Sequence, residues 1–337
     1  MYKIVEPLFI ICETPLHAGT GSDLGIIDLP IQRERHTQYP KIEASGLKGA
    51  LRVAFEDKTI DTFKINEHKV KIQLSFGYDP DGKNTEKVKK EEDGQFAGAL
   101  GFSDARILLF PVKSLKGTFA WVTCPNVINK FIKDMSICKI KPDFTYINND
   151  ENTVVNNPIL TINTEKTEVV LEDSLLTVKE NENTTKIAEY FSKVIFPQTE
   201  EYIYWSELIK KNFIIISNDT FKDFVTLATE VITRTKINNE TGTVKDGALF
   251  TEEYLPSETI MYTLSMFSPL FQNGSVFNNP YWQDEINEYA VRDFFRTSLP
   301  EVVQIGGNAT LGKGLVKFNK YDSDTPENSN KKEGDVK

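Results

Sequence analysis

The chain has 337 residues, and its 49 acidic and 39 basic side chains give a formal charge of −10 at pH 7. The length allows one large domain or two ordinary ones, and the hydrophobic and charged fractions are typical of a globular protein. No apolar run approaches the roughly 20 residues that span a bilayer, and the first residues lack a signal-peptide pattern. These features exclude a membrane-spanning protein and predict a cytoplasmic one.

The cysteines and histidines give no recognisable metal motif. Three scattered cysteines, at positions 12, 124 and 138, predict buried thiols in a reducing compartment. The three histidines have none of the spacings that are typical of zinc ligands. We therefore expect no zinc site.

The acidic balance argues against a nucleic-acid binder if it is read alone, because affinity for phosphate comes from lysine and arginine. Between residues 33 and 52, however, five basic side chains outnumber two acidic ones. A basic strip on an acidic body is consistent with RNA binding. An ordinary solvated surface is the alternative.

A long loop joins the first predicted strand to the first predicted helix. Residues 4–12 are typical of a buried strand, and residues 44–56 predict a helix with Ser45 as its N-cap. Between them, glycines 19, 21 and 25 allow backbone N–H groups to turn toward one point, and Lys48 lies in the first turn of the helix. This combination suits a phosphate, and a surface loop rich in turn formers is the alternative.

The next part of the chain predicts an α+β sheet. Strands are expected over residues 70–76, 105–112 and 117–123, and a helix over 125–135. The order strand, helix, strand, strand, helix is typical of an α+β fold with its helices on one face of the sheet. The polar residues 79–94 predict a mobile insertion.

The second half predicts further strands around an exposed hairpin. Residues 143–199 have weak strand patterns and predict a second insertion. A strand over 213–217 leads into a helix capped by Asn218 or Asp219, and residues 232–254 predict the hairpin. The remaining elements are strands over 257–268, 302–305 and 315–318 and an amphipathic helix over 284–296.

Three segments together resemble a known family. They are LGIIDLPIQRERH at 24–36 followed by SGLKG at 45–49, DGALFTEEYLP at 246–256, and QIGGNATLGKG at 304–314. In this order they are similar to the signature of the repeated backbone RAMP subunit of type III-B (Cmr) CRISPR effector complexes. The stretches near 60–95 and 143–199 carry no such resemblance.

The resemblance implies a fold. It implies a ferredoxin-like (RRM-like) RAMP core in a single domain over residues 1–320, with insertions near 60–95 and 143–199. It also implies a protruding thumb hairpin near 230–255 that wedges between bases of a guide–target duplex. Residues 321–337 are polar without periodicity and predict a disordered tail.

The resemblance also implies a function. Such a subunit binds guide crRNA, stacks head to tail on copies of itself into a helical filament, and assembles with other type III-B effector subunits. It is an endoribonuclease that cleaves complementary target RNA at regular intervals, with recognition of the target delegated to base pairing.

The resemblance assigns catalysis to Asp28, as proton acceptor or as ligand of a divalent metal ion, Mg²⁺ or Mn²⁺. His17 matches the family's histidine at the end of the first strand. Glu252 and Tyr254 match a Glu-x-Tyr element that the family brings near the scissile phosphate from a neighbouring copy. From the residues alone, each of these side chains also has a structural reading, as a turn acid, a strand-end histidine or a paired strand residue.

A larger set of basic, glycine and hydroxyl residues is assigned to the guide-RNA backbone. The set comprises Arg33, Arg35, Ser45, Lys48, Gly306, Gly307, Gly312 and Lys313. This interpretation requires that the two glycine turns lie together in the folded chain and that Asp28 is accessible.

Three other functions remain open on the sequence. The first is an architectural crRNA-binding subunit without nuclease activity. The second is a guide-processing endoribonuclease that acts alone, although the chain has few histidines for acid–base catalysis. The third is a protein-interaction scaffold without RNA, which is compatible with the acidic charge.

Overall fold

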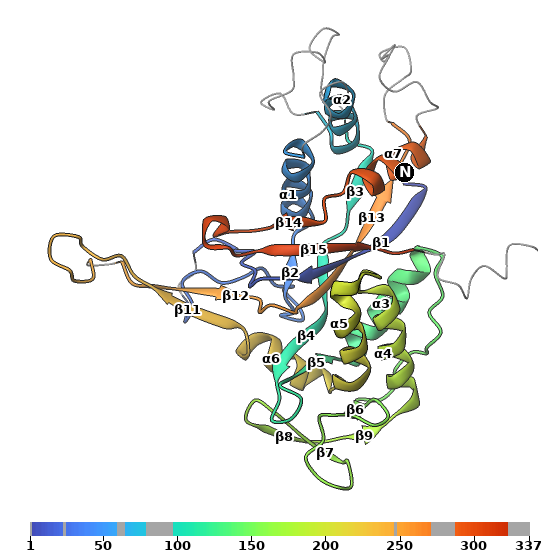
Figure 1. Ribbon diagram of the computed structural model, residues 1–337, viewed down its shortest axis with the longest axis vertical. Helices are drawn as coiled ribbons and strands as arrows, with labels where there is room; N and C mark the ends of the chain where they lie inside the picture. The colour runs from blue at the N-terminus through green and yellow to red at the C-terminus, as the bar shows by residue number, and fades with distance from the viewer. Residues whose placement is uncertain are drawn as a thin grey trace, which may run out of the picture.

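A large mixed β-sheet runs through the molecule, with helices packed against it (Figure 1). The computed structural model describes residues 2–22, 25–58, 65–78, 97–245, 248–270 and 287–322. The insertion predicted over 79–94, residues 323–337 of the predicted tail and the start of the helix predicted over 284–296 lie outside the described residues. Across the sheet the strands follow the order β14-β15-β1-β13-β4-β5-β10-β6-β9.

The centre of the sheet is antiparallel. β1 (Ile4–Cys12) pairs with β13 (Ile260–Phe267) on one side and with β15 (Leu315–Lys320) on the other. The last six residues of β1 are buried because both faces of the sheet are covered, which explains the unbroken apolar run. The neighbouring strands are β2 (Lys41–Ile42), β3 (Leu100–Phe102), β4 (Ala105–Lys113) and β14 (Val302–Gln304).

α1 (Ala44–Glu56) and α7 (Glu288–Ser298) cover one face of this sheet. The rings of Phe55 and Phe295 stack between the two helices, with their centroids 5.7 Å apart. Phe295 also contacts the ring of Phe267 on β13, at 5.8 Å. Both helices therefore pack on the face to which Phe267 points.

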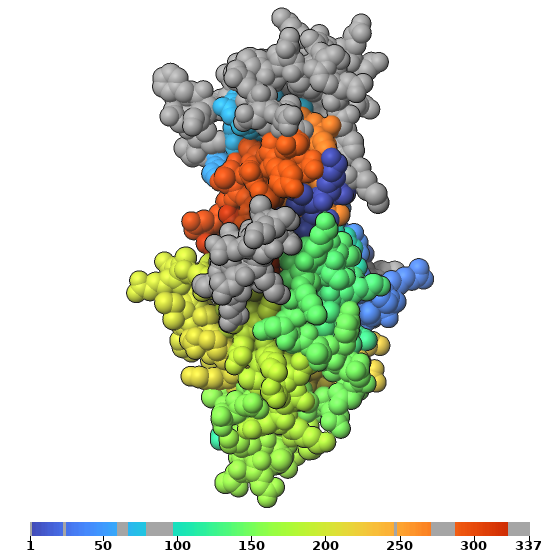
Figure 2. Space-filling view, turned by 90° about the vertical axis from the view of Figure 1, so that its right-hand side faces the viewer, coloured from blue at the N-terminus to red at the C-terminus, as the bar shows by residue number. Residues whose placement is uncertain are grey.

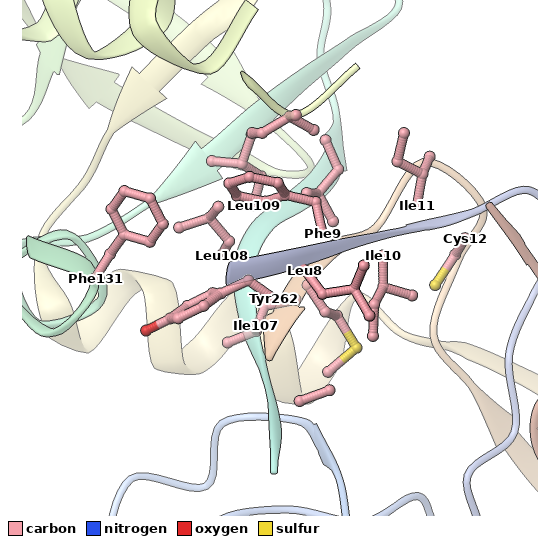
Figure 3. Close-up of a cluster of buried hydrophobic side chains, with 14 of the residues drawn as sticks. Leu8, Phe9, Ile10, Ile11, Cys12, Ile107, Leu108, Leu109, Phe131 and Tyr262 are labelled. Atoms are coloured by element: carbon pink, nitrogen blue, oxygen red, sulfur yellow. The ribbon is translucent and has the colours of Figure 1, made fainter. Parts of the chain in front are cut away.

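α3 (Pro125–Ile137) covers the opposite face. Phe9 and Tyr262 are directly paired across β1 and β13, and the ring of Phe131 contacts both, at 6.3 and 5.2 Å. Figure 3 shows Phe131 and Tyr262 beside the apolar side chains of β1 and β4. Side chains alternate along a strand, and Phe267 lies five positions after Tyr262, so α3 and α7 are on opposite faces. The prediction that the helices share one face is therefore wrong.

Beyond β4 the sheet continues into a second lobe, which carries α3, α4 and α5 (green to yellow in Figure 2). The residues 143–199, predicted as an insertion with weak strands, extend the main sheet here and add a helix, α4, that was not predicted. The elements of this lobe are β5 (Phe119–Thr123), β6 (Thr153–Val154), β7 (Glu168–Leu171), β8 (Ser174–Thr177), β9 (Lys179–Glu180), α4 (Glu182–Val194), α5 (Glu200–Asn212), β10 (Phe213–Ile215) and α6 (Asn218–Leu227).

Residues 70–76 form part of a helix, α2 (Ile65–Phe76), and not the predicted strand. The apolar residues of this stretch alternate with others in the sequence, as in a half-buried strand. In the structure, however, Ser75 is as buried as Leu74 and Phe76 on either side of it. A short run that is buried on several sides does not distinguish a helix from a strand.

The N-caps of two helices lie before the predicted residues. α1 begins at Ala44, whose amide donates a hydrogen bond to Asp104 Oδ1 at 3.0 Å, so Ser45 lies inside the first turn and is not the N-cap. The N-cap of α6 is Ser217, which accepts a hydrogen bond from the amide of Thr220. In both cases the sequence placed the helix correctly and misplaced its N-cap.

β11 (Glu230–Arg234) and β12 (Phe250–Tyr254) form an antiparallel hairpin that is separate from the main sheet. The hairpin projects to one side of the molecule (Figure 1). A short 3-10 helix, η3 (Ala309–Leu311), lies in the glycine-rich turn between β14 and β15. In the part of the chain that the structure describes, no helix is long and apolar enough to cross a bilayer.

Candidate active site

The loop after β1 and the glycine-rich turn after β14 contact each other. The amide of Gly307 donates a hydrogen bond to the main-chain oxygen of His17 at 2.9 Å. Gly306 has a φ of +80°, and a Cβ at this position would lie 2.1 Å from the same oxygen, so only glycine fits. The two glycine turns therefore lie together, as the interpretation of the sequence requires.

A buried carboxylate, that of Glu252 on β12, lies at the centre of this contact. Its Oε2 accepts hydrogen bonds from Arg234 Nε at 2.6 Å and from the Tyr254 hydroxyl at 2.5 Å, and its Oε1 accepts one from Asn308 Nδ2 at 2.6 Å. Burial raises the pKa of Glu252, but these donors and the nearby His17 lower it more, so the pKa lies below its ordinary value. The carboxylate is therefore ionised and held in one orientation.

His17 and Tyr254 complete the network. His17 Nδ1 donates a hydrogen bond to the main-chain oxygen of Glu253 at 2.7 Å, which leaves Nε2 facing Glu252 Oε1 at 3.6 Å. The Tyr254 hydroxyl accepts hydrogen bonds from Asn308 and Arg234, and the ammonium of Lys313 lies 4.9 Å from the centre of its ring. Three of the four residues predicted to be catalytic thus meet in one cluster.

Asp28, the fourth, lies on the surface and is attached to the same strand of the hairpin. Its Oδ2 accepts hydrogen bonds from the amide and the hydroxyl of Thr251, at 2.7 and 2.9 Å. The hydrogen bond from the Thr251 amide, and then that from its hydroxyl, lower the pKa of Asp28. Asp28 is exposed, so this carboxylate is not sealed in the interior.

The loop that carries Asp28 pairs with β12 through its main chain. The amide of Leu29 donates to the oxygen of Thr251, and the amide of Glu253 donates to the oxygen of Leu29, both at 3.0 Å. Leu29 and Glu252 form a parallel bridge. The loop therefore lies along β12 like a third strand of the hairpin.

Arg33 is engaged inside the protein. Its guanidinium donates to Glu253 Oε1 at 2.5 Å and to the main-chain oxygens of Gln38 and Val225, each at 2.9 Å. Only 14% of the Arg33 side chain and 2% of that of Glu253 are exposed. The ion pair joins the loop to β12, and the hydrogen bond to Val225 joins it to α6. These contacts argue against the predicted contact of Arg33 with RNA.

The other residues predicted to bind RNA have different surroundings. Arg35 and Ser45 are exposed. Lys48 Nζ donates to the main-chain oxygen of Leu100 at 2.8 Å, and burial lowers the pKa of this lysine. Gly312 has a φ of +70°, and a Cβ there would have open space around it. Of the eight residues in this set, Gly306, Gly307 and Lys313 adjoin the cluster around Glu252.

Three residues of the site were not predicted, namely Thr251, Arg234 and Asn308. Asn308 is in the left-handed region, with a φ of 64°, inside the glycine-rich turn whose role was predicted. Arg234 lies two residues after Ile232, which is paired with Glu252 across the hairpin, so the two-residue period of a strand places Arg234 on the same face. That period was the signal that could have identified Arg234.

The donor atoms of the site do not form an all-protein metal cage. Among the residues that the structure describes, no group of three or more histidine, cysteine, aspartate or glutamate side chains is placed to hold an ion. Asp28 offers a single exposed carboxylate. Mg²⁺ is commonly held by one or two carboxylates together with waters and substrate phosphates, and Asp28 fits that arrangement.

The chain is similar to known proteins over most of its length. The family model described as the RAMP superfamily matches residues 9–317. The chain is 35% identical over 307 residues to the CRISPR system Cmr endoribonuclease Cmr4 of Pyrococcus furiosus, and the match covers 90% of this chain and 91% of that protein. The crystal structure of oligomeric Cmr4 from Pyrococcus furiosus has a TM-score of 0.65 at 26% identity, with 95% of this chain and 100% of that chain covered.

A further likeness concerns the fold alone. A chain in the cryo-EM structure of the type III-B Cmr-beta complex bound to cognate target RNA has a TM-score of 0.66 at 18% identity. The match covers 95% of this chain and 98% of that chain.

Proposed function

Because the chain belongs to the RAMP superfamily and, within it, to the family of the Cmr endoribonuclease Cmr4, we propose that it is a backbone subunit of a type III-B CRISPR effector. In this role it binds a guide crRNA and cuts the target RNA that pairs with the guide. The observation that carries the proposal is the exposed carboxylate of Asp28, held by the strand that also carries Glu252 and Tyr254.

Asp28 is the proposed proton acceptor. Cleavage of RNA by its own 2′-hydroxyl needs in-line attack and a base beside that hydroxyl. The carboxylate of Asp28 is ionised at neutral pH, since the hydrogen bonds from Thr251 lower its pKa below the ordinary value of 3.8. Its exposure leaves room for an RNA strand.

The cluster around Glu252 contains two cations, Arg234 and Lys313, and is built on the same strand as Thr251, which holds Asp28. As the 2′-oxygen attacks, negative charge grows on the phosphate and the departing 5′-oxygen, and fixed cations and donors stabilise it. We assign this stabilisation to Arg234 and Lys313, and a positioning role to Glu252 and Tyr254, which hold Arg234 by hydrogen bonds. His17, whose Nδ1 is fixed by the oxygen of Glu253, orients the same network.

A divalent ion at Asp28 is part of the proposal. Mg²⁺ or Mn²⁺ bound by this carboxylate and by phosphates of the RNA would supply a Lewis acid at the scissile phosphate. Chelation with EDTA, followed by addition of each ion, tests this part. Unchanged cutting in EDTA would remove the ion from the account and leave Asp28 as a base alone.

The order of the central strands supports a ferredoxin-like core in a single domain over residues 1–320. β15, β1, β13 and β4 lie side by side, with α1 between β1 and β4 in the chain and α7 between β13 and β15. This is the strand–helix–strand–strand–helix–strand succession of ferredoxin-like domains. The hairpin β11–β12 is the proposed thumb, and its exposed apolar residues Val231, Leu249 and Phe250 suit contact with bases.

Assembly follows from the backbone role. One subunit spans a short stretch of guide, so copies stack head to tail through an interface that does not close into a ring, alongside other subunits of the effector. The guide backbone is assigned to Arg35, Ser45, Lys48, Lys313 and the glycine turn, without Arg33. We propose a cytoplasmic location, with which the three free thiols agree.

The experiment that tests the proposal uses the effector assembled from the full chain, its partner subunits and a guide of known sequence. The unmodified complex should cut a complementary target at regular intervals, and Asp28→Ala should abolish the cuts while the bound guide RNA stays the same in amount. Asp173→Asn changes an exposed acid in the β7–β8 turn and is the matched control. Undiminished cutting by Asp28→Ala, or a complex that contains no RNA, would overturn the proposal.

The same experiment separates the alternatives. Regular cutting by the unmodified complex excludes the architectural subunit without nuclease activity. Cleavage of precursor repeat RNA by the isolated chain would instead favour a guide-processing enzyme.

A further inference from the structure

We propose that Thr251 is a positioning residue that fixes the carboxylate of Asp28 and ties its orientation to the hairpin β11–β12. This inference rests on the proposed function, because it takes Asp28 as the group that accepts the proton. Thr251 itself touches no reacting atom in this account.

Thr251 holds Asp28 by three hydrogen bonds. The amide and hydroxyl of Thr251 both donate to Asp28 Oδ2, at 2.7 and 2.9 Å, and the amide of Asp28 donates to Thr251 Oγ1 at 3.0 Å. The hydroxyl thus serves one residue both as donor and as acceptor, and it fixes the side chain and the main chain of Asp28 together. An exposed aspartate without such partners exchanges between staggered rotamers, whereas in-line attack requires a fixed base.

The hydrogen bonds of the main chain make Asp28 part of the hairpin. On one side of β12, Thr251 is paired with Thr233 of β11. On the other side, its oxygen accepts a hydrogen bond from Leu29, the residue after Asp28. Asp28 therefore moves with the hairpin. Binding of the hairpin to an RNA duplex would also determine the orientation of the Asp28 carboxylate.

A purely structural role for Thr251 is the competing explanation, and the two are separable. The pairing of Leu29 with Thr251 and Glu253 uses main-chain atoms only, so it persists when the hydroxyl is removed. Thr251→Val resembles threonine in shape and lacks the hydroxyl, Thr251→Ala lacks it as well, and Thr251→Ser retains it. The matched control is Thr177→Val, which alters an exposed strand threonine at the end of β8, outside the hairpin.

The first readout is cutting by the assembled complex under single-turnover conditions, together with the affinity for target RNA. Thr251→Val and Thr251→Ala should slow cutting about 10- to 100-fold. Both variants lose a hydrogen bond to the charged carboxylate of Asp28 and, with it, the fixed orientation of this base. Affinity for the target should not change, Thr251→Ser should restore the rate, and the Thr177→Val complex should cut at the unmodified rate.

The second readout does not depend on activity. The exchange of the Asp28 amide hydrogen with deuterium is followed by NMR in the full chain. Thr251→Val should speed this exchange, because the amide loses its hydrogen-bond acceptor, Thr251 Oγ1. Thr177→Val should leave the exchange rate unchanged.

The outcomes distinguish this inference from the proposed function. If Asp28→Ala stops cutting while Thr251→Val and Thr251→Ala cut at the unmodified rate, only the role of Thr251 is refuted. A loss that Thr251→Ser does not restore, or an unchanged exchange rate of the Asp28 amide in Thr251→Val, also refutes it. Normal cutting by Asp28→Ala refutes the proposed function itself.

Discussion

The main-chain oxygen of His17 accepts a hydrogen bond from the amide of Gly307, which joins the loop after β1 to the turn before β15. These segments lie at opposite ends of the chain, and their contact brings His17 beside Glu252, Tyr254 and Asn308. The site thus depends on a close approach of two main chains, which a side chain at position 306 would prevent.

Gly306→Ala should destabilise the fold and misplace the cluster. The added Cβ would lie 2.1 Å from the oxygen of His17, and the φ of +80° is strained for alanine, so we expect a loss of about 3 kcal/mol or more in the free energy of unfolding. Denaturant unfolding of the isolated chain measures this.

Gly312→Ala is the control for that substitution. Gly312 has a similar φ of +70°, but nothing lies within 4 Å of the position of an added Cβ. It should therefore cost about 1 kcal/mol, from backbone strain alone. Equal losses for the two variants would contradict the close approach of Gly306 to His17.

Arg33→Met should affect stability more than RNA binding. The substitution leaves the carboxylate of Glu253 buried without its cation, although Thr229 and Ile31 still donate to it, and we expect a loss of about 3 kcal/mol in the free energy of unfolding. Arg35→Met changes an exposed cation and should instead weaken guide binding without changing stability. The reverse pattern, measured by unfolding and by RNA titration, would assign Arg33 to the RNA.

Glu252 should make stability depend on pH in the acid range. Its pKa in the folded chain is below the ordinary value of 4.5, so its stabilising contribution is present above pH 4.5 and is lost as the pH falls through the folded value. Glu252→Gln should remove this part of the acid sensitivity. The difference in unfolding free energy between the two proteins, measured from pH 7 downward, should shrink below pH 4.5, and a constant difference would contradict the network.

Glu258 should act in the opposite direction. Burial, and then the charge of Glu13, raise its pKa from 4.5 to about 7. A raised folded pKa means that its contribution is present below pH 4.5 and is lost as the pH rises through 7. Glu258→Gln should therefore raise the Tm at pH 8 relative to the unmodified chain and have little effect at pH 4. A lower Tm at pH 8 would contradict this account.

The elements at the centre of the sheet follow from their local sequence. β1 spans residues 4–12 and α3 begins at Pro125, both as predicted, because a continuous apolar run and a proline at the first turn are local signals. The choice of His17, Glu252 and Tyr254 as site residues came from the family resemblance, which brought Glu252 and Tyr254 to the scissile phosphate from a neighbouring copy; their meeting within one chain was not predicted. The residues by themselves left each of the three with an ordinary structural reading.

The errors lie where a distant partner decides the structure. Ser45 is not the N-cap because α1 already begins at Ala44. The amide of Ala44 donates a hydrogen bond to Asp104, a residue from another part of the chain. Arg33 was predicted to contact RNA, whereas in the structure its guanidinium pairs with Glu253, far along the sequence. Arg234 had a signal in the strand period, but its pairing with Glu252 also depends on the register of the hairpin, which a long loop does not fix.

The most direct test of the account is the rate of target cutting by the assembled complex when every copy carries Asp28→Asn, which keeps the shape of the side chain and removes its charge. We expect the rate to fall by about 100-fold or more, as for the loss of a general base, while guide content and target affinity stay the same. Cutting at the unmodified rate, at the same positions on the target, would contradict the assignment of the chemistry to this carboxylate.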